Sequence, residues 1–214
     1  LLLQSPTGTN TFNVDGQENY GAPNQELVVE GRITAAGLLR KTGSMGKLSL
    51  ANTNTFGSAA LIESGTLEAK GVGVDEALGP GTITMLGSTK LNVRNRSQTV
   101  TNSFAIGSGP APFIASYGCT VTLAGGIDVP AGRSFQFGMS SSSLLVLSNT
   151  VTGAGNLLIM RSGTAFTSTN QFTPGNLNVG SAGGIAILDG VSWAAFTNCY
   201  TAGYGTGNRQ WQMG

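Results

Sequence analysis

The sequence contains no histidine and only two cysteines among its 214 residues. Without histidine, the chain cannot form Ser-His-Asp or Cys-His catalytic arrangements or histidine-ligated metal sites. Charged residues make up only 10% of the chain, and the formal net charge is +1. Lysine and arginine are scattered singly, which argues against nucleic-acid binding because that function needs a basic surface. We expect no cofactor, and no acidic Ca²⁺-binding loop or repeat is present.

Long apolar segments and helical patterns are also missing. No segment approaches the roughly 18 uninterrupted apolar residues of a membrane-spanning helix, so we expect no membrane span in this chain. No window combines apolar residues at helical spacing with capping residues, so we expect essentially no helix.

The chain instead contains many short apolar runs that alternate with polar residues. Glycine, at 33 residues, asparagine or proline bounds nearly every run, which is the pattern of strands and turns in an all-β protein. The clearest runs occupy residues 47–50, 66–69, 82–86, 90–93 and 120–123.

A long pattern occurs twice. ITAAGLLRKTG at residues 33–43 is similar to VTGAGNLLIMRSG at residues 151–163. The similarity extends on both sides, so we interpret the chain as two degenerate copies of a long module, at about 12–95 and 127–190. Residues 1–190 would form one domain, and residues 191–214 a divergent aromatic and glycine-rich segment that caps or docks.

Three architectures fit many short strands: a sandwich, a barrel or a solenoid. The spacing of the strands, roughly 8–12 residues, suits a sandwich or barrel. The duplication and the shortage of hairpin turns favour a parallel β-helix, or β-solenoid, in which each coil returns one step along the axis. With roughly 20–25 residues per coil, the chain would make about nine coils.

The first copy resembles a known family. GLLRKTG at residues 37–43, LSL at 48–50, NTFG at 54–57 and GTL at 65–67 resemble the autotransporter-associated β-strand repeat. The match covers about 60 residues and is moderately specific, whereas the second copy is degenerate, with Arg161 in place of the motif lysine. The resemblance implies a right-handed parallel β-helix on the outside of a bacterial cell.

Carboxylates are the remaining catalytic groups. A polysaccharide lyase or glycosidase would need acids from different coils to converge, and the sequence does not forbid this, because Glu63 and Glu68 could stack against other coils. Only Asp75 and Glu76 are adjacent, and neighbouring strand residues face opposite ways. We expect no enzyme, and keep carboxylate-based cleavage as an alternative. The acids are Asp15, Glu18, Glu26, Glu30, Glu63, Glu68, Asp75, Glu76, Asp128 and Asp189.

Cys119 and Cys199 form the only pair available for a disulfide. In a secreted chain they could pair, which would contribute roughly 4 kcal/mol for a loop of this length. The alternative is two separate buried thiols, because pairing requires Cα atoms within about 7 Å.

Aromatic residues gather near the C-terminus, where both tryptophans and two of the four tyrosines follow residue 190. Such a segment, or an N-terminal strand, either caps the solenoid core or docks onto another subunit. The capping or assembly candidates are Leu1, Leu2, Leu3, Phe12, Val14, Trp193, Phe196, Tyr200, Tyr204 and Trp211.

These observations favour a non-catalytic structural protein of the cell exterior, such as a stalk, fibre or surface-layer subunit that self-assembles through its ends. The first alternative is an adhesin whose flank binds a glycan or host surface. The second is the carboxylate-based enzyme.

Overall fold

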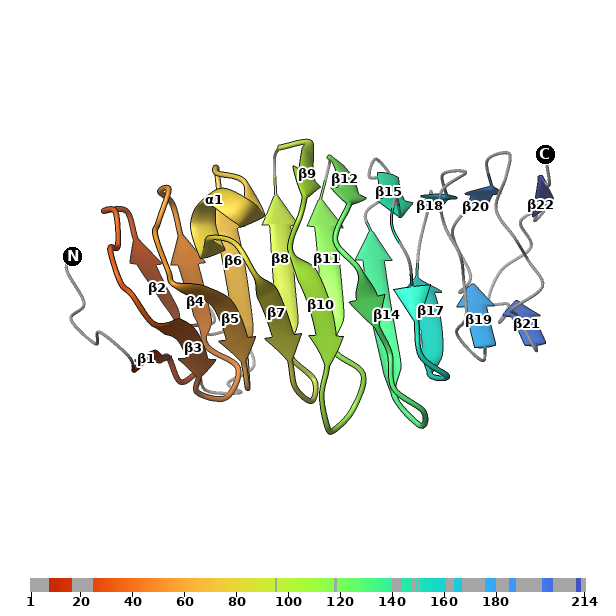
Figure 1. Cartoon of the computed structure of the whole chain (residues 1–214), viewed down its shortest axis with the longest axis horizontal. Coiled ribbons are helices and arrows are strands. Elements are labelled where there is room, and N and C mark those ends of the chain that lie inside the picture. Colours follow the sequence, from red (N-terminus) through yellow and green to blue (C-terminus); the bar gives the residue numbers. More distant parts are fainter. Residues whose placement is uncertain are drawn as a thin grey trace.

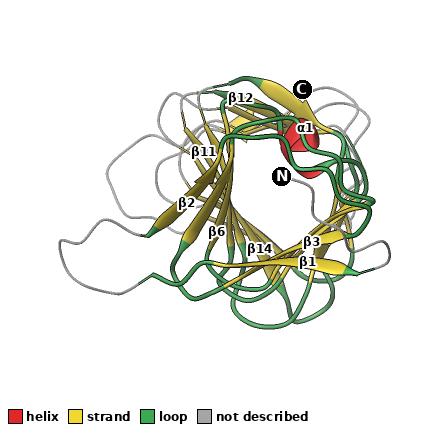
Figure 2. Ribbon diagram, turned by 90° about the vertical axis from the view of Figure 1, so that its left-hand side faces the viewer, coloured by secondary structure: helices red, strands yellow, loops and turns green. Residues whose placement is uncertain are grey.

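The computed structural model describes residues 8–16, 25–94, 96–117, 119–139, 144–147, 149, 151–160, 164–166, 176–179, 185–187, 198–201 and 211–212, with side chains described as far as residue 155. The chain forms a β-solenoid whose strands stack along one long axis (Figure 1). Viewed along that axis, the strands surround a central core (Figure 2). The expected all-β solenoid class is therefore confirmed, and the right hand of the coil stays a prediction.

The longest sheet, here sheet 1, has nine parallel strands. Their first residues, 26, 47, 66, 90, 113, 134, 156, 176 and 198, follow one another at intervals of 19–24, close to the expected coil length. The strands are β2 (Glu26–Val29), β4 (Lys47–Leu50), β6 (Thr66–Lys70), β8 (Lys90–Arg94), β11 (Phe113–Tyr117), β14 (Ser134–Met139), β17 (Asn156–Met160), β19 (Asn176–Val179) and β21 (Asn198–Thr201).

Two further parallel sheets form the other sides of the solenoid. Sheet 2 consists of β1 (Thr9–Asn13), β3 (Leu38–Thr42), β5 (Ser58–Ile62), β7 (Thr82–Met85), β10 (Ser103–Ile106), β13 (Ile127–Asp128) and β16 (Val151–Thr152). Sheet 3 consists of β9 (Gln98–Val100), β12 (Thr120–Leu123), β15 (Leu144–Leu147), β18 (Thr164–Phe166), β20 (Ile185–Ile187) and β22 (Trp211–Gln212).

The five alternating runs identified in the sequence all become strands. They correspond to β4, β6, β7, β8 and β12, with bounds that agree within one residue. Alternation succeeds here because each strand turns one face to the core and the other outward, as the buried and half-buried residues of β12 show.

The third side of the solenoid changes along the axis. Before β9 it has no strand among the described residues, only a bridge between Thr34 and Thr55 and the short helix α1 (Val74–Leu78). Helix α1 lies over the edge of sheet 3, where the Val74 amide donates to Gln98 Oε1 at 2.6 Å. The expectation of essentially no helix thus holds apart from these five residues, which protect an edge strand from pairing with other chains.

Apolar ladders fill the core. On sheet 1, Leu48, Leu67 and Leu91 lie opposite one another in β4, β6 and β8 and are fully buried. Burying a leucine contributes roughly 1.5–3 kcal/mol, so each coil adds a similar increment to stability. Further along the axis, Phe135 packs against Phe104 and Phe137, with ring centroids 6.0 and 4.7 Å apart.

The two copies of the long pattern do not occupy equivalent positions. GLLRKTG of the first copy contains β3 of sheet 2, whereas its counterpart in the second copy contains β17 of sheet 1. When the modules at 12–95 and 127–190 are aligned by sequence, a strand of sheet 2 in the first is therefore matched with a strand of sheet 1 in the second. Short alternating strands bounded by glycine occur on every side, so a sequence alignment can match one side with another.

The proposed division after residue 190 stays a prediction, because only residues 198–201 and 211–212 of the segment that follows are described. Strand β21 pairs with β19 in sheet 1, and β22 pairs with β20 in sheet 3. These two strands extend the same sheets.

The possible disulfide between Cys119 and Cys199 is not formed, in line with the alternative of separate thiols. Cys119 is a buried free thiol, 3.4 Å from Ser116 Oγ. Cys199 lies in β21, which is four strands beyond β11 in sheet 1. Four interstrand spacings amount to about 19 Å, well outside the Cα separation of a disulfide.

Candidate functional site

The motif lysine, Lys41, lies inside the solenoid with no exposed surface. Its ammonium group donates to the carbonyl oxygens of Val14 at 3.3 Å, Thr42 at 2.5 Å, Gly43 at 3.2 Å and Ser64 at 3.2 Å. These carbonyls follow β1, β3 and β5, three consecutive strands of sheet 2. Because a buried charge is tolerated only when it is hydrogen-bonded, the contacts join three coils around one ammonium group. We call this arrangement the Lys41 staple.

Glycines of the motif make room for the Lys41 staple. Gly65 has φ +72°, and a Cβ atom there would lie 2.9 Å from the Lys41 ammonium nitrogen and 2.5 Å from the Gly46 carbonyl oxygen. A side chain at position 65 would be strained by its backbone and would also push against the staple. The glycine of the GTL segment is therefore needed for the hydrogen bonds that the motif lysine makes.

Burial changes the protonation of Lys41. Loss of water around the ammonium lowers the pKa of Lys41 to about 8, and the nearby Asp15 carboxylate partly offsets that effect. The group still carries its proton at neutral pH, which suits an environment of four carbonyl acceptors.

Asparagines join coils on the third side of the solenoid. Asn54 Oδ1 accepts from the Ile33 amide at 2.7 Å, and its Nδ2 donates to the Ala77 carbonyl at 2.9 Å. Asn102 Nδ2 donates to the carbonyls of Gly79 and Gly81, both at 2.9 Å. Each of these buried amides bonds the backbone of a neighbouring coil, so the asparagine of the NTFG segment is also a staple.

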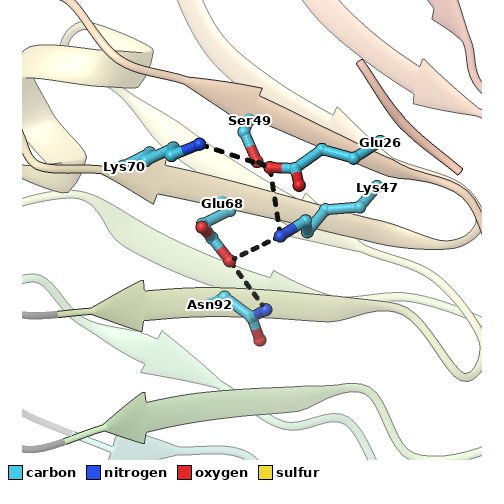
Figure 3. A network of polar contacts seen from close by, with 6 residues as sticks. All are labelled: Glu26, Lys47, Ser49, Glu68, Lys70 and Asn92. Carbon is cyan, nitrogen blue, oxygen red and sulfur yellow. Dashed lines mark hydrogen bonds and ion pairs between the residues drawn. The ribbon is translucent and has the colours of Figure 1, made fainter. Parts of the chain in front are cut away.

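Charged side chains cross the outer face of sheet 1 (Figure 3). Lys47 in β4 lies 3.1 Å from Glu26 in β2 and 3.4 Å from Glu68 in β6. Ser49 Oγ donates to Glu26 at 2.6 Å, and Asn92 Nδ2 in β8 donates to Glu68 at 3.1 Å. We call these five residues the outer network; it links four consecutive strands of sheet 1.

The outer network contains the acid pair that most closely meets the geometry of a glycosidase. Glu26 and Glu68 contact the same ammonium, so the contacting oxygens are at most about 6.5 Å apart, within the range of catalytic pairs. However, the Lys47 ammonium bridges the two carboxylates, and Glu68 is only 3% exposed. The Ser49 hydrogen bond and the nearby lysines lower the pKa of Glu26, which is opposite to what a general acid needs.

Other acids also accept hydrogen bonds from, or form ion pairs with, groups on neighbouring parts of the solenoid. Asp75 accepts from the Thr101 amide at 3.0 Å and from its hydroxyl at 2.6 Å, which joins α1 to the next coil. The Gly73 amide and Arg96 lower the pKa of Glu76. Glu63, directly after β5 in sheet 2, pairs with Arg40 at 2.6 Å. Within the described ranges, no three potential ligands gather at a metal site.

The assembly candidates fall into three groups. Phe12 packs against the core, and Val14 is buried with its amide donating to the Thr42 carbonyl at 3.1 Å, so both belong to the first coil. Tyr200 and Trp211 lie in β21 and β22. The other candidates lie outside the described residues: Leu1, Leu2, Leu3, Trp193, Phe196 and Tyr204.

Sequence reasoning missed one surface residue, Leu27 of β2. It is 42% exposed, although its ladder partner Leu48 is fully buried. Period-two alternation places Leu27 on the core face, and only its position in the first strand of sheet 1 exposes it. The roles of Lys41 and Asn54 were also missed, although both belong to the recognised motif.

No family model, curated protein or solved structure matches the chain. The likeness to autotransporter-associated repeats therefore rests on the motif alone. None of the helices in the described part is long and apolar enough to cross a membrane.

Proposed function

We propose that this chain is a non-catalytic structural β-solenoid of the bacterial cell exterior, a subunit of a stalk, fibre or surface layer. The observation that carries the proposal is the use of the motif side chains. Lys41 and Asn54 both bond the backbone of neighbouring coils, and Gly65 leaves space for the first of these contacts. The motif thus serves the rigidity of the solenoid.

The state of the carboxylates supports the same proposal. Glu26 and Glu68 are bridged by Lys47, while Asp75 and Glu76 fasten α1. An acid catalyst requires a carboxyl group with a raised pKa that can reach substrate. The two acids with a resolved shift, Glu26 and Glu76, both have a lowered pKa. The exterior location is supported by the resemblance to autotransporter-associated repeats.

Glu68 separates a structural role from a catalytic one. We expect the wild type to release no reducing ends or unsaturated products from neutral or acidic polysaccharides. Glu68→Gln should lower the thermal midpoint by a few degrees because it weakens the contact with Lys47. The control is Glu30→Gln, an exposed acid, which should leave the midpoint unchanged. Cleavage by the wild type that Glu68→Gln abolishes would overturn the proposal in favour of an enzyme.

An adhesin is the second candidate, favoured by a shallow groove of about 320 Å³ on sheet 2. Its lining includes Thr82, Ser103, Asp128 and Thr152, and hydroxyl and carboxylate groups suit the hydroxyls of a glycan. Glycan-array binding that Asp128→Ala removes, while stability is kept, would favour the adhesin. Binding that Asp128→Ala leaves unchanged would exclude this groove.

A further inference from the structure

Among the described strands, β2 forms one edge of sheet 1. Leu27 lies at the first position of the core ladder and is 42% exposed, whereas Leu48, Leu67 and Leu91 further along are at most 1% exposed. No described strand pairs with the other side of β2. The edge of sheet 3, by contrast, is covered by α1. An exposed apolar residue beside unpaired backbone groups is a site for pairing with another strand.

The register of sheet 1 is unbroken from β2 to β21. Following the ladder partners strand by strand leads from Glu26 in β2 to Tyr200 in β21, and from Leu27 to Thr201. Sheet 1 therefore continues by simple translation along the axis. A second copy placed one step beyond β21 would bring its own β2 into the same ladders, with Glu26 opposite Tyr200.

The hydrogen bonds between strands repeat in the same way. In the five steps from β2 to β14, a ladder residue donates its amide to the carbonyl that precedes its partner. The bonds are Lys47 N to Gln25 O at 2.8 Å, Thr66 N to Gly46 O at 3.0 Å, Lys90 N to Gly65 O at 3.0 Å, Phe113 N to Thr89 O at 2.9 Å and Gln136 N to Pro112 O at 2.9 Å. Alternate residues of a parallel strand bond to the same neighbour, so the amides of Glu26 and Val28 point to the open edge.

We propose that the chain polymerises head to tail by adding β2 of one copy to β21 of the preceding copy, in parallel and in the register of sheet 1. The Glu26 amide would donate to the Cys199 carbonyl of the preceding copy, and the Val28 amide to its Thr201 carbonyl. The proposal rests on the proposed structural function and names its partner, a second copy of this chain. Each added copy would lengthen the fibre by about nine interstrand spacings, roughly 43 Å.

A cysteine at position 25 tests the register directly. Gln25 would lie opposite Cys199 of the preceding copy, and neighbouring ladder Cα atoms about 4.8 Å apart can form a disulfide. Under mild oxidation, Gln25→Cys in the full chain should give covalent oligomers at multiples of 21.8 kDa on a non-reducing denaturing gel. Peptide analysis should find the disulfide between positions 25 and 199. The matched control is Glu26→Cys, which lies opposite Tyr200 and on the other strand face, and should give no such oligomers.

A proline at position 28 tests the edge itself. Val28→Pro removes an amide that faces away from β4 and that would bond the other copy. Light scattering should therefore find only monomers at concentrations where the wild type polymerises. Val28→Thr keeps the amide and should assemble normally; circular dichroism checks that both variants fold. The inference is overturned if the wild type remains monomeric and Gln25→Cys forms no link, or if Val28→Pro polymerises like the wild type. Either result can be told apart from failure of the structural proposal, because that proposal is tested by polysaccharide cleavage and by glycan binding.

Discussion

The first coils and the middle coils hold together in different ways. Up to Gly81, the third side has no described strand, and buried Asn54 and Asn102 supply side-chain bonds between coils there, while Lys41 joins coils at the ends of sheet 2 strands. From β9 onward a third sheet supplies backbone bonds, and Phe104, Phe135 and Phe137 fill the core. The difference indicates that the buried asparagines replace a missing strand ladder on the third side, because buried backbone groups need partners.

The largest expected effect lies in the middle coils. Phe135→Ala should lower the free energy of unfolding by about 4 kcal/mol, because it removes a fully buried ring and leaves a cavity between two other rings. Chemical denaturation followed by circular dichroism measures the change. Phe113→Ala is the control: its ring lies 5.3 Å from the Lys90 ammonium, is only half-buried, and should cost about 1 kcal/mol. Equal losses would contradict an aromatic core in this region.

In the first coils, Lys41→Met should cost about 3 kcal/mol. Methionine fills most of the volume of the lysine stem but removes the donor that the four carbonyl oxygens share; of these oxygens, that of Thr42 keeps the Val14 amide as a donor. The same denaturation experiment on Arg40→Met provides a control in the adjacent residue. Arg40 forms a part-exposed ion pair with Glu63, and its loss should cost no more than about 1 kcal/mol. A neutral or stabilising Lys41→Met would show that the ammonium is not a staple.

Asn54→Ala should cost about 2 kcal/mol, because the Ile33 amide and the Ala77 carbonyl would stay buried and unpaired. Asn52→Ala, two residues earlier and exposed, should cost a few tenths of a kcal/mol. Thermal unfolding of the two variants side by side measures the difference. Similar midpoints would mean that the Asn54 amide does not join the coils.

Lowering the pH should produce the smallest loss of stability, and we expect this loss to begin with protonation of Glu26 in the outer network. The folded-state pKa of Glu26 is lowered, so its contribution to stability is present above the unfolded pKa and lost as pH falls through the folded value. The free energy of unfolding should therefore decrease below about pH 4.5. Glu26→Gln should show a shallower decrease than the wild type, whereas Glu30→Gln should follow the wild type. Parallel curves for Glu26→Gln and the wild type would contradict the direction of this shift.

The sequence predicts the strands well because each run alternates over a short span and ends at glycine. The sequence does not predict where each strand lies around the coil, since similar runs occur on all sides. That is why residues 33–43 and 151–163 match in sequence yet differ in position. Helix α1 is equally hard to predict, because its five residues depend on Gln98 and Thr101 from the next coil.

The candidate site was predicted only in part. The motif drew attention to Lys41 and Asn54, but a lysine in a strand is normally interpreted as exposed. Its spacing of two from buried Leu39 was the available signal for the core face. The exposure of Leu27 depends on its place in the first strand of sheet 1, which no local pattern encodes.

Native-state hydrogen exchange on Lys41→Met tests the central claim most directly. In a solenoid, each coil contacts mainly its neighbours, so a broken staple should loosen its own surroundings first. Mass spectrometry should find faster exchange in β3 and β5, and unchanged exchange in β12. Unchanged exchange throughout, or the same increase in β12 as in β3, would contradict the claim that Lys41 holds the first coils together.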